Sequence, residues 1–82
     1  MTAAETVLTD ALRLVLSRPD LELSPDMGLG VTEGWDSFAH IDLVLAIEES
    51  AGIEFGTEEI PEVTTVPALL SAITRRMDGG PA

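Results

Sequence analysis

One stretch of the sequence decides the fold: residues 36–52 read DSFAHIDLVLAIEESAG. Asp36 is a good N-cap, because its carboxylate can accept a hydrogen bond from a backbone N–H of the first helical turn. Gly52 is a good stop, because glycine tolerates the left-handed conformation that closes many helices. No proline or glycine lies between these two residues. The stretch therefore predicts a helix from Ser37 to Ala51.

This predicted helix carries apolar residues on two opposite faces. At about 100° per residue, Leu43, Ala46 and Ile47 share one face, with Val44 between the two faces. We expect Leu43, Ala46 and Ile47 to contact the core. The other face combines large apolar side chains with carboxylates, and its members are Phe38, Ile41, Asp42, Leu45, Glu48 and Glu49. An exposed apolar stripe with a charged rim is typical of an interaction site, so this face is predicted to remain in contact with water.

A second helix is predicted at the start of the chain. Thr2 and Glu5 have the T-x-x-E spacing of a capping box, and Arg18-Pro19 ends the helical pattern because a residue before proline avoids the helical region. The side expected to face the core consists of Val7, Leu8, Ala11, Leu12, Leu14 and Val15. The side expected to face water consists of Thr9, Asp10, Arg13 and Ser17.

A last helix is predicted from the cap residue Thr65, with Pro67 in the tolerant first turn. Its inward stripe has helical spacing and consists of Val66, Leu69, Leu70, Ile73 and Met77. Gly79-Gly80-Pro81 cannot continue a helix. We therefore expect one domain over residues 1–77 and a disordered tail over residues 78–82.

Two connections complete the predicted fold. Residues 19–35 are rich in proline and glycine, and their expected anchors to the core are Leu21, Leu23, Met27, Leu29, Val31 and Trp35. We read this segment as a long but ordered loop. In the second connection, Thr57 can cap a short acidic turn through Glu58, Glu59 and Ile60 before Pro61. The predicted class is all-α, a three-to-four-helix bundle with a long first loop.

Composition narrows the chemistry. The 82 residues include no cysteine and one histidine, which excludes thiol nucleophiles, disulfides and clusters of imidazole ligands. Four arginines and no lysine stand against fifteen acidic residues, for a formal net charge of -11. Nucleic acid and anionic membranes would repel such a chain, whereas a protein with a basic surface would attract it. The longest apolar run, Leu43 to Ile47, is too short to span a bilayer, and the start lacks a basic signal region, so we expect a cytoplasmic monomer.

The motif Trp35-Asp36-Ser37-Phe38 permits two interpretations. Asp36 and Ser37 can be an ordinary N-cap and first helical residue, or Ser37 can carry a covalent group where the helix dipole stabilises anions. A hydrolase triad of Ser37, His40 and Asp36 or Asp42 is a weaker alternative, and His40 is better placed as a packed residue at the core edge. A calcium loop at Asp20 is rejected, because Pro25 stands where an EF-hand needs glycine.

A wider pattern resembles the acyl carrier proteins. Its members, over roughly residues 3–77, are Asp36-Ser37-Phe38, Ile41, residues 43–49, Gly52-Ile53-Glu54-Phe55 and Thr64-Thr65-Val66. The resemblance implies that Ser37, next to Asp36, carries 4'-phosphopantetheine, whose thiol holds acyl groups, and that the carrier itself does no chemistry. An acidic helical docking module without a prosthetic group is the alternative.

The resemblance also implies partners. These are a phosphopantetheinyl transferase and acyltransferases, adenylating ligases or synthases with basic docking surfaces, and they would bind a face formed by Phe38, Ile41, Asp42, Leu45, Glu48, Glu49, Glu58 and Glu59. Residues 34–38, G-W-D-S-F, differ from the G-A-D-S-L of primary fatty-acid carriers and from the G-G-x-S of peptidyl carriers. The chain is therefore most similar to discrete carriers of specialised pathways such as polyketide, aminoacyl or glyceryl loading.

Overall fold

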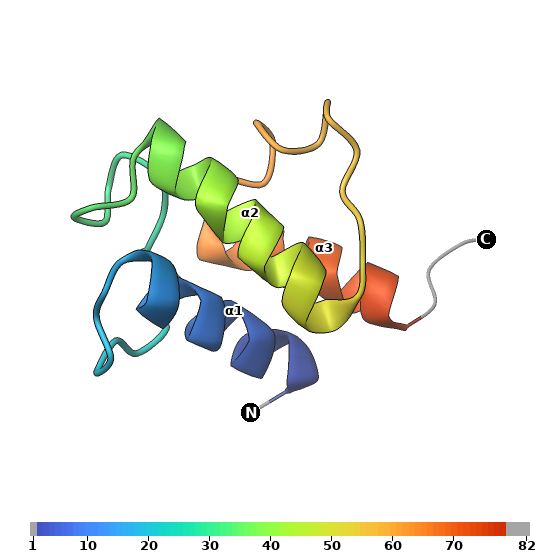
Figure 1. The fold of residues 1–82 in the computed structure, drawn as a ribbon, viewed down its shortest axis with the longest axis horizontal. Coiled ribbons are helices and arrows are strands. Elements are labelled where there is room, and N and C mark those ends of the chain that lie inside the picture. The colour runs from blue at the N-terminus through green and yellow to red at the C-terminus, as the bar shows by residue number, and fades with distance from the viewer. Residues whose placement is uncertain (1, 79–82) are drawn as a thin grey trace.

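The computed structural model describes residues 2–78 and shows a small all-helical domain. Its helices are α1 (Ala3–Val15), α2 (Ser37–Ala51) and α3 (Val66–Met77) (Figure 1). α1 packs against both other helices, whereas α2 and α3 approach each other less closely. Within the described residues there is no strand, and one isolated bridge joins Gly28 to Thr65. The bundle therefore has three helices, the lower end of the predicted range.

The predicted helix starts are confirmed. Thr2 Oγ1 accepts from the Glu5 backbone N–H at 3.1 Å, and Glu5 Oε1 accepts from the Thr2 N–H at 2.6 Å, which completes the capping box. The Thr2 backbone N–H, and then its hydroxyl, hold the pKa of Glu5 below its ordinary value. Thr65 Oγ1 accepts from the Ala68 N–H at 3.2 Å in the same way.

α2 has the ends that the sequence predicts. Asp36 accepts from the Ala39 N–H, and Gly52 closes the helix at a φ of 68° in the left-handed region. Because most residues are strained at such a φ, glycine is the natural residue there. The Gly52 N–H donates to the Glu48 carbonyl at 2.9 Å.

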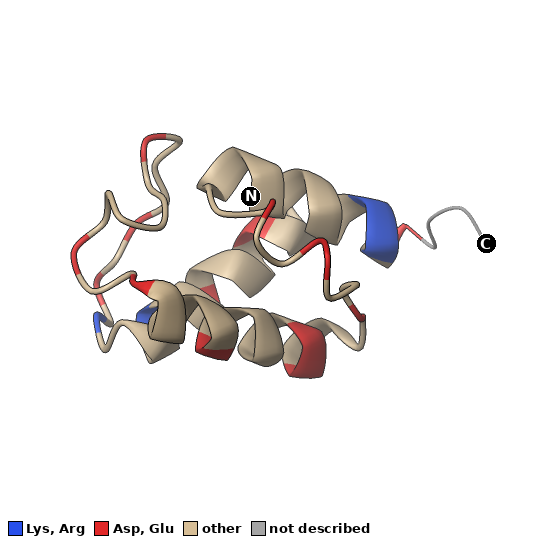
Figure 2. Cartoon of the chain, turned by 90° about the horizontal axis from the view of Figure 1, so that it is seen from above, with Lys and Arg blue, Asp and Glu red and all other residues tan. Residues whose placement is uncertain are grey.

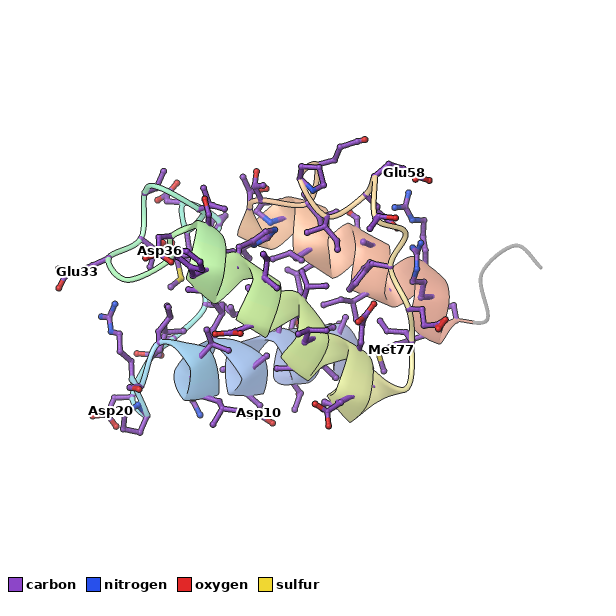
Figure 3. All side chains as sticks on the ribbon, turned by 45° about the horizontal axis from the view of Figure 1, so that its top comes forward. Asp10, Asp20, Glu33, Asp36, Glu58 and Met77 are labelled. Atoms are coloured by element: carbon purple, nitrogen blue, oxygen red, sulfur yellow. The ribbon has the colours of Figure 1, made fainter. Side chains whose placement is uncertain are left out.

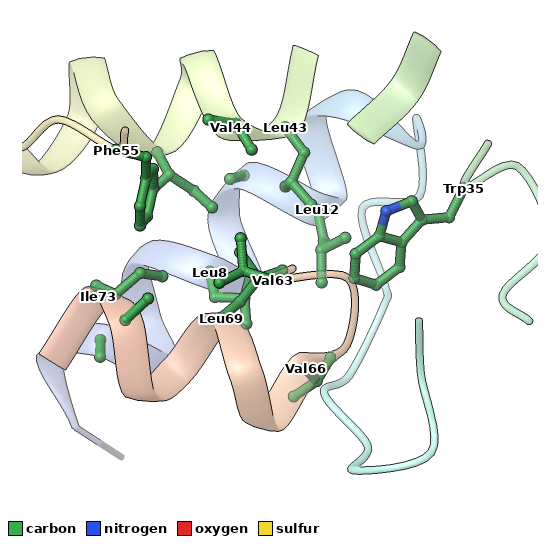
Figure 4. Packing of buried hydrophobic residues seen from close by; sticks show 14 of the residues in the cluster. Leu8, Leu12, Trp35, Leu43, Val44, Phe55, Val63, Val66, Leu69 and Ile73 are labelled. Atoms are coloured by element: carbon green, nitrogen blue, oxygen red, sulfur yellow. The ribbon is translucent and has the colours of Figure 1, made fainter. Parts of the chain in front are cut away.

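One hydrophobic core joins the three helices, and Figure 4 shows Trp35 at one end of it and Ile73 at the other. Its largest fully buried side chains are Leu8, Leu12, Trp35, Leu43, Val44, Ile47, Leu69 and Ile73. The inner face predicted for α2 is confirmed at Leu43 and Ile47, and Ala46 packs partly buried against the cluster. Val44, predicted between the two faces of α2, belongs to the core.

Three side chains on the helices differ from their expected burial. Leu14 is 73% exposed and Thr9 is buried. Because α1 packs against two helices, its buried arc extends to Thr9, about 100° from Leu8, while Leu14 lies about 120° away on the other side. Met77, the last residue of α3, is 38% exposed.

The long first loop is ordered, but one of its predicted anchors is wrong. Leu21 and Trp35 are buried, and Leu23, Met27 and Leu29 pack partly buried against the core. Val31 is 76% exposed, because it lies on a turn in which the N–H groups of Val31 and Thr32 both donate to the Gly28 carbonyl.

This loop is pinned to the start of α3. The Leu29 N–H donates to the Thr64 carbonyl at 2.8 Å, and the Val66 N–H donates to the Met27 carbonyl at 3.1 Å. A side chain at Gly28 would place its Cβ 3.0 Å from the Thr64 carbonyl oxygen, which is a tighter contact than most Cβ atoms make. Glycine at residue 28 therefore lets the two backbones approach without a shift.

The second connection, residues 52–65, forms turns rather than a fourth helix. The Glu59 N–H donates to the Gly56 carbonyl, and the Glu59 carboxylate, not the predicted cap Thr57, pairs with the Gly56 N–H at 3.4 Å. Arg76 holds this connection against α3: its guanidinium pairs with Glu59, donates to the Glu54 carbonyl and lies 5.1 Å from the centre of the Phe55 ring.

The C-cap of α3 falls inside the tail that we expected to be disordered. Asp78 is the C-cap of α3, and its backbone N–H donates to the Thr74 carbonyl at 3.0 Å. The remainder of that predicted tail, residues 79–82, lies outside the described residues. No helix in the stretch from 2 to 78 is long and apolar enough to cross a membrane.

Candidate functional site

Ser37, the first residue of α2, is exposed. Asp36 provides the cap: its side chain accepts from the Ala39 N–H and its carbonyl from the His40 N–H, both at 2.8 Å. The N–H groups of Ser37 and Phe38 precede any carbonyl that could accept them within the helix. They carry the partial positive charge of the helix end. An anionic ester on Ser37 would therefore meet a favourable electrostatic environment.

The predicted exposed stripe of α2 is confirmed. Phe38 is 82% exposed, Ile41 53% and Leu45 52%. Together with Ser37, these three side chains lie on the outer side of a single helix. Single exposed apolar residues are ordinary, but three large ones in one row on an 82-residue domain make this row a candidate interaction surface. We call Phe38, Ile41 and Leu45 the apolar stripe.

Carboxylates surround this stripe with little basic charge to balance them. Figure 2 shows the basic residues at two places only in the described chain, near the end of α1 and near the end of α3, whereas acidic residues occur over most of the ribbon. Asp42 and Glu49 are exposed on α2, and Glu58 is exposed on the second connection. Figure 3 shows Asp36 at the start of α2 and Glu58 on the connection between α2 and α3.

Two of the predicted docking carboxylates are engaged within the protein. Glu48 is half-buried, and its Oε2 accepts from the Phe55 backbone N–H at 2.8 Å. Glu59 pairs with Arg76 and lies 3.8 Å from the Arg75 guanidinium. The open acidic rim of the stripe on α2 therefore consists of Asp42 and Glu49, while Glu48 and Glu59 hold the second connection in place.

His40 is buried, as we predicted for a residue at the core edge. Its Nδ1 lies 3.1 Å from Trp35 Nε1, and its Nε2 lies 3.0 Å from the Ile60 carbonyl oxygen. The indole and imidazole rings stack with their centroids 6.1 Å apart. Because both nitrogens have other partners, His40 does not activate Ser37 in this structure, and the hydrolase arrangement is not formed.

Sequence reasoning missed these internal contacts of His40, Glu48 and Glu59. Trp35 and His40 are separated by five residues across a loop and a helix start, and His40 and Ile60 by twenty. No periodic pattern predicts such pairs. The one signal available was composition, since the only tryptophan and the only histidine of the chain lie close together. Within the described residues no group of three or more metal-binding side chains could hold a metal ion.

Comparison with known proteins adds no assignment. No protein-family model matches the chain, and no solved structure matches it significantly. Its function is therefore inferred from the site itself.

Proposed function

We propose that this protein is a discrete acyl carrier protein, which holds acyl or aminoacyl groups as thioesters on a 4'-phosphopantetheine group attached to Ser37. One observation carries the proposal: a capped, exposed serine begins a helix whose outer face also shows a large apolar stripe with a carboxylate rim. Either feature alone would be ordinary. Together they support an attachment point and a docking surface on the same helix.

The residues present fit this prosthetic group. When bound, the group supplies a flexible arm and a terminal thiol for the thioester. Ser37 Oγ would form the ester bond, and Ser37 is an exposed residue at the surface where a modifying enzyme would bind. Asp36 already has a hydrogen-bond partner in the Ala39 N–H, which leaves the amides of Ser37 and Phe38 for the phosphate oxygens. Asp36 therefore acts as a positioning residue that fixes the start of α2.

The docking face fits partners that present a basic surface around an apolar pocket. The candidates are a phosphopantetheinyl transferase, followed by acyltransferases, adenylating ligases or synthases of polyketide or related natural-product synthesis. Asp42 and Glu49 would attract such partners from a distance, and the apolar stripe would form the dry centre of the interface. A carrier that visits several enzymes needs interfaces that are small and short-lived, and one helical face provides this.

The test is modification by a phosphopantetheinyl transferase with coenzyme A, followed by intact mass spectrometry. We expect the wild-type protein to gain one phosphopantetheinyl group and Ser37→Ala to gain none. Ser50→Ala is the matched control, because Ser50 is also exposed on α2 but lies near its other end. It should be modified like the wild type.

Two results would overturn the proposal. If Ser37→Ala still gains the group, the attachment site is wrong. If folded wild-type protein is never modified by several transferases, the acidic docking module without a prosthetic group becomes the better description. Circular dichroism of Ser37→Ala separates loss of the hydroxyl from loss of the fold.

A further inference from the structure

The buried ring of His40 connects three parts of the molecule. It belongs to α2, it contacts Trp35 at the end of the long loop, and it contacts the Ile60 carbonyl in the second connection. His40 is 3% and Trp35 2% exposed, so water has little access to the contact between their rings, while the contact to the Ile60 carbonyl is partly buried. Hydrogen bonds with low exposure restrain the groups they join more firmly than exposed ones do.

The two partners of His40 select one form of the ring. The indole Nε1 of Trp35 can only donate, so His40 Nδ1 must accept. The Ile60 carbonyl can only accept, so His40 Nε2 must carry the proton. The structure is therefore consistent only with neutral imidazole that has its proton on Nε2.

A protonated ring cannot keep both contacts. Imidazolium carries an N–H on each nitrogen, so Nδ1–H would point at the N–H of Trp35. Two buried donors that face each other leave a polar group without a partner and a charge away from water, and both cost free energy. The contact to the Ile60 carbonyl survives protonation, whereas the contact to Trp35 does not.

Trp35 in turn holds the residues before Ser37. Its carbonyl accepts from the Gly30 N–H at 2.9 Å, and its N–H donates to the Thr32 carbonyl at 3.0 Å, which closes the turn of residues 28–35. Asp36 follows directly and caps α2. Trp35 is therefore one peptide unit from the cap residue and two from Ser37.

We propose that His40 is a proton-sensitive brace: protonation of its ring releases Trp35 and loosens the start of α2, and this alters the setting of Ser37. Histidine is the side chain whose charge ordinarily changes between pH 5 and 8. This proposal depends only on residues of the chain itself, so it does not require that Ser37 carries a prosthetic group.

Charged groups near the brace do not replace its partners. Those within four sequence positions of Trp35, His40 or Ile60 are Glu33, Asp36, Asp42, Glu58, Glu59 and Glu62. All except Glu59 are exposed, and Glu59 pairs with Arg76. In residues 2–78, the hydrogen-bond partners of the ring are the uncharged groups of Trp35 and Ile60.

The chain has one tryptophan and one histidine, so their NMR signals can be assigned without ambiguity. We would follow the ¹⁵N signals of the His40 ring, the indole N–H signal of Trp35 and the backbone amides of Ser37 and Phe38 by NMR from pH 8 to pH 5. At pH 8 the ring should be the tautomer with its proton on Nε2. On acidification the Trp35, Ser37 and Phe38 signals should shift with the same midpoint as the ring, while the Thr6 amide at the start of α1 stays in place.

His40→Gln is the matched variant, because its amide N–H can still reach toward the Ile60 carbonyl but cannot titrate. Its Trp35 fluorescence should lack the pH transition that we expect for the wild type. If this variant does not fold, the wild-type NMR titration decides alone. The proposal is overturned by a ring with its proton on Nδ1 at pH 8, by a ring that titrates without moving the Trp35 and Ser37 signals, or by a ring that stays neutral until the protein unfolds.

Discussion

The two faces of α2 carry similar apolar side chains, but one face is buried and the other is exposed. Leu43 and Ile47 on the inner face are 1% and 0% exposed, whereas Leu45 and Ile41 on the outer face are 52% and 53% exposed. The same helix thus contains one leucine and one isoleucine in the core and another of each in water. The type of side chain does not determine which of these residues is buried. Their angular position around the helix axis does.

The difference shows which part of the helix the fold requires. Burial of a leucine or isoleucine side chain contributes about 1.5 to 3 kcal/mol, and an exposed one gains little of this. The apolar stripe therefore contributes little to folding and adds a risk of aggregation. Its presence is explained if another molecule buries it for part of the time. α1 differs here, since Leu14 is its single large side chain that is mostly exposed.

The largest expected effect separates the two isoleucines. Ile47→Ala removes buried methyl groups and should cost about 2 to 5 kcal/mol of unfolding free energy. A core in a domain this small rarely provides more than about 3 to 5 kcal/mol, so much of the variant should be unfolded at 37 °C. Ile41→Ala should change stability by less than about 0.5 kcal/mol. Urea unfolding followed by circular dichroism measures both, and equal losses would mean that Ile41 is part of the core.

The fold was predictable where its causes are local. Thr2 with Glu5, Asp36 and Thr65 each cap a helix within three residues, so their roles can be recognised without knowing the rest of the structure. The exposure of Phe38 follows in the same way from the angle between it and Ile47. Thr9 and Leu14 were assigned to the wrong sides because burial on α1 depends on where two other helices lie, and no local pattern contains that information.

The site was predictable to the same extent. Ser37, Asp36 and the apolar stripe lie on one helix, and helix geometry places them together. The roles of Glu48 and Glu59 were not predictable, because their partners are a backbone N–H seven residues away and an arginine seventeen residues away. The contacts of His40 were not predictable for the same reason, because their partners are distant in the sequence. Which family the chain belongs to, and whether Ser37 is modified, stay predictions.

The second expected effect concerns the lifetime of a complex with the phosphopantetheinyl transferase. Ile41→Ala should make dissociation about tenfold faster, because apolar contacts at the centre of an interface act mainly on the off-rate. This factor should hold at every salt concentration. Leu14→Ala is the control, since Leu14 is equally large and apolar but is exposed on α1. Surface plasmon resonance gives both rates, and equal effects of the two variants would move the docking face away from α2.

A smaller effect is expected for the charges of the outer face. Asp42→Lys should slow association several-fold at low salt, because it replaces attraction to a basic partner by repulsion. Asp10→Lys makes the same change in net charge on α1 and should slow association less. The difference should shrink at about 0.15 M salt, where the Debye length is about 8 Å. If both variants slow association equally, the net charge of the protein attracts the partner, and the position of the charges on α2 does not matter.

The smallest expected effect divides two neighbouring residues, Glu48 and Glu49. Glu49 is exposed in the last turn of α2, where the helix dipole is negative and no basic residue compensates it. Glu49→Gln should therefore raise the unfolding free energy by about 0.3 to 1 kcal/mol at low salt, and less at high salt.

Glu48 lies in the same turn, but its carboxylate accepts from the Phe55 N–H, and a neutral amide makes a weaker hydrogen bond of this kind. Glu48→Gln should consequently bring no gain, because relief from the dipole is offset by the weaker bond. Thermal unfolding of the two variants in low and high NaCl makes the comparison. Equal stabilisation by both would show that the hydrogen bond between Glu48 and the Phe55 N–H contributes nothing to stability.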